Sequence, residues 1–89
     1  MVNKMTSIYS EEYQLVIKTL RNARLAQGIT QEVLAQKLNR PQSFVAKFEN
    51  GERKLDIVEF VHIARLLSIE PATVVSELSH IVEARINNL

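Results

Sequence analysis

The sequence predicts a small all-α protein of five helices, and three observations support this fold class. The chain has 89 residues, of which only two are Gly and two are Pro, and 46% are hydrophobic. Many Leu, Ile, Val, Ala, Glu and Gln with few turn-forming residues favour helices over strands. Apolar residues recur in several segments at three- and four-residue steps, the spacing of one helix face. A chain of this length forms a single domain with one modest core.

The first helix is predicted to begin after Ser10 and to run to about Gln27. Ser is a favoured N-cap residue, and the two Glu that follow it suit the positive end of a helix dipole. Residues 1–9 are therefore expected to form an N-terminal arm. Gly28 suits the left-handed backbone that commonly follows the last turn of a helix.

Two short helices around a tight turn are predicted next. Thr30 is expected to cap a helix over residues 31–38, and Asn39 begins the turn because Asn tolerates a positive φ. Pro41 disfavours helical backbone at the residue before it and suits a helix start, so a third helix is expected over residues 42–50. This is the layout of a helix-turn-helix, in which one helix braces against the DNA backbone and the next enters the major groove.

The fourth and fifth helices have clear start signals. Asp56 and Glu59 have the spacing of an Asp version of the capping box, which predicts a helix from Ile57 to about Leu67. Pro71 is expected to open the last helix, which continues over residues 71–89. Two adjacent apolar lines run along the fourth helix, namely Ile57, Val61 and Ala64, and Phe60, Ile63 and Leu67.

A specific pattern surrounds the predicted turn. Thr-Gln-Glu-x-Leu-Ala at residues 30–35 is followed by Glu-Asn-Gly at residues 49–51. In this pattern the chain resembles the Cro/repressor-like (XRE) family of helix-turn-helix transcriptional regulators, over roughly residues 16–70. The resemblance implies a five-helix lambda-repressor-like fold, with the helix-turn-helix DNA-binding domain in residues 10–70 and a C-terminal helix in residues 71–89. It also implies that the protein is usually a homodimer on a partly palindromic operator. Matching residues are Arg24, Gly28, Ile29, Thr30, Gln31, Glu32, Leu34, Ala35, Leu38, Gln42, Ser43, Val45, Phe48, Glu49, Asn50, Gly51, Ile63, Ala64, Leu67 and Ile69.

The third helix carries the candidate base-reading residues. Gln42, Ser43 and Lys47 are expected on the side opposite Val45 and Phe48. Gln can bind adenine through a paired donor and acceptor, Lys favours guanine, and Ser can hydrogen-bond to almost any base. The resemblance places these three residues at base-reading positions. The alternative is a solvated helix face with no partner.

Five further residues are candidates for contacts with the DNA backbone. Gln31 matches a family position that binds phosphate and often supports the first Gln of the third helix. Asn50 and Arg53 follow the third helix and are expected to face the backbone, and Arg40 and Lys54 suit phosphates better than bases. Arg53 and Lys54 have an alternative role as ordinary solvated loop charges. Phosphate contacts fix the docking register and make binding salt-dependent without reading sequence.

Three residues around the third helix are interpreted through packing. Phe44 either touches a thymine methyl or folds back over the second helix as part of the core, and its spacing favours packing. The resemblance implies that Arg24 and Glu49 form an ion pair that ties the first helix to the end of the third. A buried pair of this kind has a structural role.

The fifth helix carries an apolar stripe at near-heptad steps, formed by Val75, Leu78, Val82 and Leu89. The stripe is wider than a single contact with the core needs, and exposed apolar patches often mark interfaces. Residues 71–89 are therefore expected to supply a homodimer contact. The alternative is that this helix folds fully onto its own domain.

Charge is unevenly distributed although the net charge is only +1. Residues 18–65 carry nine Lys or Arg and five acids, giving +4, whereas residues 1–17 carry −1 and residues 66–89 carry −2. A basic centre suits a polyanionic partner such as double-stranded DNA. The alternative is a normal mixed surface.

Several other classes are not supported by the residues. The chain has no Cys, His62 and His80 are isolated, and there is no Gly-rich phosphate loop, so no metal, cofactor or enzymatic activity is expected. No apolar run approaches the ~20 residues of a membrane span. The N-terminus lacks the apolar core of a signal peptide, which predicts no membrane association and a cytoplasmic location.

The sequence therefore predicts a sequence-specific, dimeric DNA-binding transcription regulator, with repression as its simplest mechanism. Two alternatives remain open. One is an antitoxin or controller protein, in which the same domain also binds a protein partner. The other is a protein-interaction module on the same scaffold, because a fold alone does not determine function.

Overall fold

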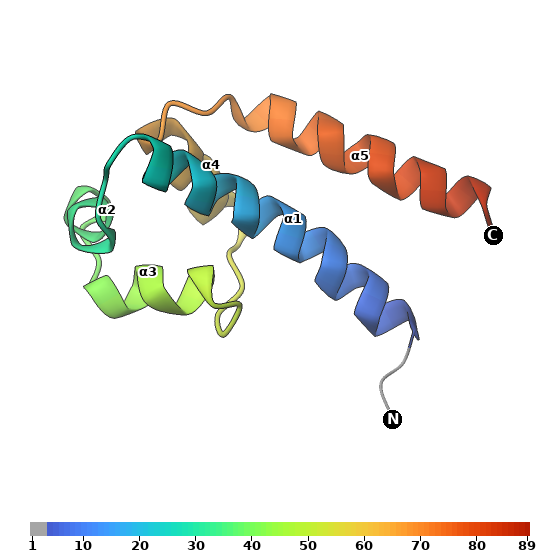
Figure 1. Ribbon diagram of the computed structural model, residues 1–89, viewed down its shortest axis with the longest axis horizontal. Helices are drawn as coiled ribbons and strands as arrows, with labels where there is room; N and C mark the ends of the chain where they lie inside the picture. The colour runs from blue at the N-terminus through green and yellow to red at the C-terminus, as the bar shows by residue number, and fades with distance from the viewer. Residues whose placement is uncertain (1–3) are drawn as a thin grey trace.

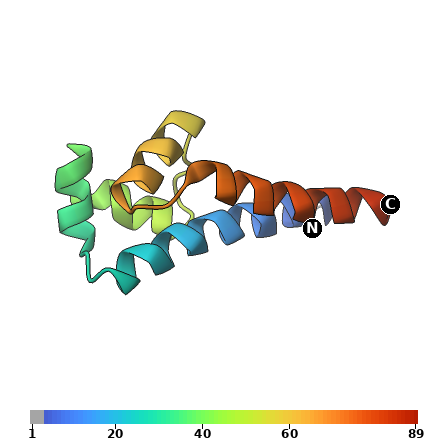
Figure 2. The same cartoon turned by 90° about the horizontal axis from the view of Figure 1, so that it is seen from above.

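Residues 4–89, described by a computed structural model, form five α-helices and no strand (Figure 1). The helices α2, α3 and α4 gather at one end of the molecule. The long helices α1 and α5 lie side by side and antiparallel, and both extend away from that end (Figures 1 and 2). This arrangement confirms the predicted all-α class. The helices are α1 Lys4–Ala26, α2 Gln31–Leu38, α3 Gln42–Glu49, α4 Ile57–Leu66 and α5 Pro71–Asn87.

The start of α1 differs from the prediction. The helix begins at Lys4, so Ser10 lies inside it and residues 4–9 are helical rather than an arm. Residues 4–9 contain neither Gly nor Pro, so nothing in the backbone stops the helix from continuing past a favoured cap residue. Residues 1–3, the rest of the predicted arm, lie outside the described residues.

Local backbone chemistry sets the boundaries of α2 as predicted. Gly28 has a φ of 68°, and the Thr30 hydroxyl accepts a hydrogen bond from the Val33 amide at 3.1 Å. Asn39 adopts the left-handed conformation with a φ of 55°, which turns the chain toward α3. Pro41 takes the N-cap position of α3 without any side-chain hydrogen bond. The tight turn between α2 and α3 therefore rests on Asn39 and Pro41.

The predicted starts of α4 and α5 are also confirmed. The Asp56 carboxylate accepts from the Glu59 amide at 2.7 Å, and the Glu59 carboxylate accepts from the Asp56 amide at 3.0 Å. Pro71 occupies the first turn of α5, and the side chain of Glu70 caps it by accepting from the Ala72 amide. Both helices therefore begin where side chains can satisfy free backbone amides.

One core holds all five helices together, and it selects which apolar line of α4 is buried. Ile57 and Val61 are 67% and 39% exposed, so only the second predicted line and Ala64 face inward. The rotation of α4 about its axis is determined by its packing against α2 and α5. The buried residues of the core are Ile17, Leu20, Leu34, Ala35, Phe44, Val45, Phe48, Phe60, Ile63, Ala64, Leu67 and Val74.

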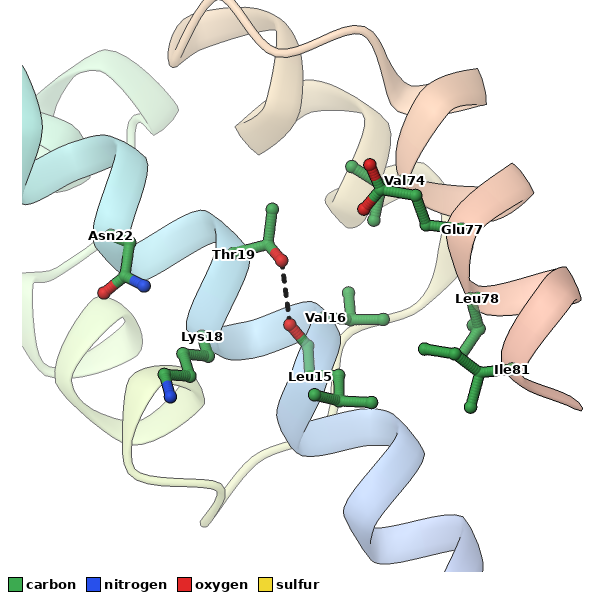
Figure 3. A pocket seen from close by; sticks show the side chains of 9 residues that line it. All are labelled: Leu15, Val16, Lys18, Thr19, Asn22, Val74, Glu77, Leu78 and Ile81. Atoms are coloured by element: carbon green, nitrogen blue, oxygen red, sulfur yellow. Dashed lines mark hydrogen bonds between the residues drawn. The ribbon is translucent and has the colours of Figure 1, made fainter. Parts of the chain in front are cut away.

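The facing sides of α1 and α5 line a shallow groove (Figure 3). Val16 of α1 lies opposite Leu78 and Ile81 of α5, and Val74 is buried at the end nearest the core. Farther along, Arg85 forms ion pairs with acids of α1. One side of α5 therefore packs on its own domain. Within the described residues, no helix is both long and apolar enough for a membrane span.

Candidate nucleic-acid interface

The outward face of α3 is polar, and its inward face is buried. Gln42, Ser43 and Lys47 are all exposed, whereas Val45 and Phe48 are completely buried. The helix is held from behind by α2 and α1. The structure therefore brings the three predicted base-reading side chains together on one accessible surface.

A chain of side-chain hydrogen bonds connects this surface to the protein interior. The Gln42 amide donates to Gln31 Oε1 at 2.9 Å, and the Gln31 amide donates to Glu49 Oε1 at 2.9 Å. A carboxylate can only accept, so Gln31 must direct its NH₂ group at Glu49 and its oxygen at Gln42. Gln42 must then donate to Gln31, which leaves its own oxygen and one N–H for another partner. The predicted support of Gln42 by Gln31 is present in the structure.

Glu49 is anchored by the predicted ion pair with Arg24. Arg24 Nε donates to Glu49 Oε2 at 2.7 Å, and Arg24 Nη2 donates to Glu49 Oε1 at 2.9 Å. Arg24 Nη1 also donates to the Ile29 carbonyl at 2.8 Å, which ties the end of α1 to the start of α2. Only 8% of the Arg24 side chain and 3% of the Glu49 side chain are exposed. The pair is confirmed, and it is buried.

Sequence reasoning missed Arg21 as a neighbour of this network. Its guanidinium Nε lies 3.9 Å from Glu49 Oε1, and its side chain is 56% exposed. Arg21 comes one helical turn before Arg24, so its place on this face follows from the helix spacing. It adds a cation on the side of α1 nearest to α3.

Phe44 lies in the core, which confirms the packing alternative and makes the thymine contact wrong. Only 6% of the residue is exposed, and its ring centroid lies 5.6 Å from that of Phe48. The guanidinium carbons of Arg40 and Arg53 lie 4.1 Å and 4.8 Å from the Phe44 ring centroid. A side chain buried to this degree has too little exposed surface to contact a base methyl group.

Arg40 and Arg53 meet again at Glu59. Arg53 donates from Nη1 to Oε1 and from Nη2 to Oε2 of this carboxylate, both at 3.0 Å. Arg40 Nη1 lies 3.5 Å from Glu59 Oε2. Arg53 is therefore not an ordinary solvated loop charge, because both ends of its guanidinium are engaged. Nothing in the local sequence predicted this partner, since the capping box already accounts for Glu59.

Lowering the pH is expected to weaken the fold through Glu59. Hydrogen bonds from Arg53, and then from the Asp56 amide, lower the pKa of Glu59 from 4.5 to about 2. An acid whose pKa is lower in the folded state stabilises that state above its unfolded pKa, and the contribution is lost as the pH falls below 4.5 toward 2. The Tm of the wild type should therefore fall more steeply over this window than that of Glu59→Gln. If the Tm of the two proteins falls in parallel over this pH range, the stabilisation by ionised Glu59 is contradicted.

Tyr13 of α1 holds the loop that follows α3, and sequence reasoning did not identify it. Its hydroxyl accepts from the Leu55 amide at 2.9 Å and donates to the Arg53 carbonyl at 3.4 Å. Burial is the main reason that the pKa of Tyr13 is raised. Lys54, in the same loop, is exposed and lies 5.8 Å above the Tyr13 ring. Asn50, at the end of α3, is also exposed.

The fold and this surface together define a helix-turn-helix domain. A family model described as "Helix-turn-helix" matches residues 20–74. A solved structure, an XRE-family like protein from Pseudomonas syringae pv. tomato str. DC3000, is similar with a TM-score of 0.82 and 42% sequence identity. The match covers 90% of this chain and 98% of that chain. No curated protein sequence matches the chain. The chain belongs to the XRE-type family of helix-turn-helix proteins.

This membership indicates the class of activity of the chain. The family consists of DNA-binding transcription regulators, and its fold is generally not that of an enzyme. The chain is accordingly a DNA-binding helix-turn-helix protein.

Proposed function

We propose that this protein is a sequence-specific transcriptional repressor that reads a two-fold operator with α3 in the major groove. The hydrogen-bonded chain from Glu49 through Gln31 to Gln42 is the observation that supports this most strongly. It presents the Gln42 amide with one orientation on an otherwise exposed helix face. An oxygen and an N–H directed outward match the N6 donor and N7 acceptor of adenine.

Phosphate contacts around α3 complete the proposed docking. Gln31 and Arg40 lie at the N-terminal side of α3, and Asn50, Arg53 and Lys54 lie just after its C-terminal end. All five are on segments that flank the base-reading face. Contacts of this kind would fix the register of α3 and make the affinity fall with salt.

Homodimerisation through α5 is the second part of the proposal. Val75 is 48% exposed and Leu89 is fully exposed, whereas Val82 is partly buried and Leu78 lines the groove against α1. The α4 residue Ile57 shares an apolar hollow with Val75 and Leu78. Exposed apolar surface of this kind is typical of interfaces. Two-fold pairing would place two copies of α3 about 34 Å apart, one turn of DNA.

The mass of the protein in solution tests this dimer. We expect analytical ultracentrifugation from micromolar to millimolar protein to show twice the chain mass, with dissociation on dilution. Val75→Asp should shift the protein toward the monomer, because it places a charge in the apolar surface. A monomer mass at every concentration would contradict the dimer and would favour a separate protein partner for this surface.

Selection of bound duplexes from a randomised DNA library tests the proposed function. At about 0.15 M salt, near physiological strength, we expect an enriched site with two inverted halves about one helical turn apart. A single enriched half-site would support sequence-specific reading but contradict a two-fold operator. Salt-sensitive binding without enrichment would contradict sequence-specific reading and favour the antitoxin or interaction-module alternatives. Placing the enriched site upstream of a reporter gene then tests repression against activation.

A further inference from the structure

Two cations beside α3 are held in a fixed arrangement that the proposed function does not by itself require. We propose that Glu59 and Phe44 are positioning residues, which hold Arg40 and Arg53 together as a preformed clamp for a DNA phosphate. This inference rests on the proposed DNA binding. We refer to Arg40 and Arg53, with Glu59 and Phe44 beneath them, as the arginine clamp.

The two arginines reach one place from opposite ends of α3. Arg40 precedes the helix and Arg53 follows it, so they lie 13 residues apart in the chain. Their guanidinium carbons converge to 4.1 Å and 4.8 Å from the centroid of the Phe44 ring. A guanidinium on an aromatic face is stabilised by stacking and by its attraction to the ring electrons. Phe44 thus provides a rigid surface that belongs to the core.

Glu59 fixes the same guanidiniums from a second direction. It receives two hydrogen bonds of 3.0 Å from Arg53 and lies 3.5 Å from Arg40 Nη1. Glu59 itself cannot turn easily, because the Asp56 amide donates to it at the start of α4. The clamp is therefore attached to two helices, to α3 through the ring and to α4 through the carboxylate.

The exposure of these side chains favours an anionic ligand. The Arg40 and Arg53 side chains are 42% and 40% exposed, whereas the Glu59 side chain is only 16% exposed. Two guanidiniums and one carboxylate leave one net positive charge, with the cations toward solvent and the anion underneath. Planar guanidinium groups bind phosphate oxygens through paired N–H donors. Binding to an ordered pair avoids the loss of side-chain freedom that two mobile arginines would incur.

A positioning role and a purely electrostatic role of Glu59 predict opposite effects of one substitution on the affinity for DNA. If Glu59 only caps α4, then Glu59→Gln removes a negative charge near DNA and should tighten binding. If Glu59 positions the arginines, the same change should weaken binding although the net charge becomes more positive. Gln at this position can still accept from the Asp56 amide, so the capping box remains available.

The experiment compares three single variants on two duplexes, the selected site and a random sequence, by fluorescence anisotropy at several salt concentrations. We expect Glu59→Gln and Phe44→Leu to weaken binding to both duplexes about 3- to 10-fold, the loss expected when one or two long side chains must be ordered during binding. The matched control is Glu52→Gln, an exposed acid next to Arg53 in the loop between α3 and α4. It should bind as tightly as the wild type or more tightly.

A chain with Arg40→Ala and Arg53→Ala separates positioning from stability. In that background Glu59→Gln should no longer weaken binding, because no arginine remains for it to position, and only the small gain from removing a negative charge is left. Thermal melts establish that each variant is folded at the assay temperature, and Phe44→Leu serves where Glu59→Gln is not folded. If Glu59→Gln binds like Glu52→Gln, the inference is overturned. A wild type that binds neither duplex would instead overturn the proposed function.

Discussion

Replacing Glu49 by alanine is expected to destabilise the fold by about 3–5 kcal/mol, because it strands a buried charge. Glu49 accepts two hydrogen bonds from Arg24, at 2.7 Å and 2.9 Å, and both side chains are more than nine-tenths buried. Without the carboxylate, the Arg24 guanidinium keeps only the Ile29 carbonyl as a partner in the interior. The variant loses the attraction between Arg24 and Glu49, and the buried Arg24 charge still lacks its hydration by water. Both effects lower the free energy of unfolding.

Urea denaturation measures this loss as a lower midpoint with an unchanged slope. The matched control is Glu52→Ala, an exposed acid just beyond α3, which should leave the midpoint nearly unchanged. Replacing both partners, as in Arg24→Met with Glu49→Leu, should cost less than Glu49→Ala, because no charge is then stranded. A Glu49→Ala midpoint equal to that of the wild type would rule out a stabilising pair.

The Glu49 substitution should also disturb the proposed reading surface. Gln31 loses the acceptor that sets its amide orientation, and Gln42 loses its fixed partner in turn. A folded Glu49→Ala protein should therefore discriminate less well at the base that Gln42 reads. The buried ion pair and the outward amide belong to one connected network.

The double substitution Gln42→Ala/Lys47→Ala is expected to lower affinity for the selected operator on the order of 100-fold, since each good base contact contributes about 1–3 kcal/mol. Both side chains are exposed on α3 and neither belongs to the core, so the fold should remain intact. Binding to a random duplex should fall much less, because only one positive charge is removed. Paired titrations with the two duplexes measure the change in the specificity ratio.

The control for this experiment is Gln36→Ala/Lys37→Ala, which removes the same two residue types from the exposed side of α2. It should leave the preference for the operator unchanged. If the α3 variant keeps its sequence preference, then Gln42 and Lys47 are not the reading residues. The remaining outward side chain, Ser43, would then be the first position to examine.

Much of this fold could be predicted because the signals for its helix boundaries are local. The bounds of α2, the starts of α4 and α5, and the turn at Asn39 agree with the predictions. Each of these depends on a side chain that contacts backbone within a few residues, or on the φ preference of one residue. Such signals can be recognised from a short stretch of sequence.

The ion pair of Arg24 with Glu49 lies between features set by local sequence and features set only by tertiary packing. Its residues are 25 positions apart, so no local rule joins them, and the prediction came only through the resemblance to a known family. The structure then shows how deeply the pair is buried and how it continues into Gln31.

What only the tertiary structure decided is which surface each helix presents and what long-range partners its side chains find. The fourth helix has two apolar lines of similar strength, and its neighbours determine that Ile57 faces solvent. Tyr13 meets the Leu55 amide across 42 residues, and Arg40 meets Glu59 across 19. The sequence by itself determined the helices and the polar face of α3, because caps, turns and helical spacing act over a few residues. The arginine clamp required the packed fold, because its four side chains converge only when α3 and α4 are in place.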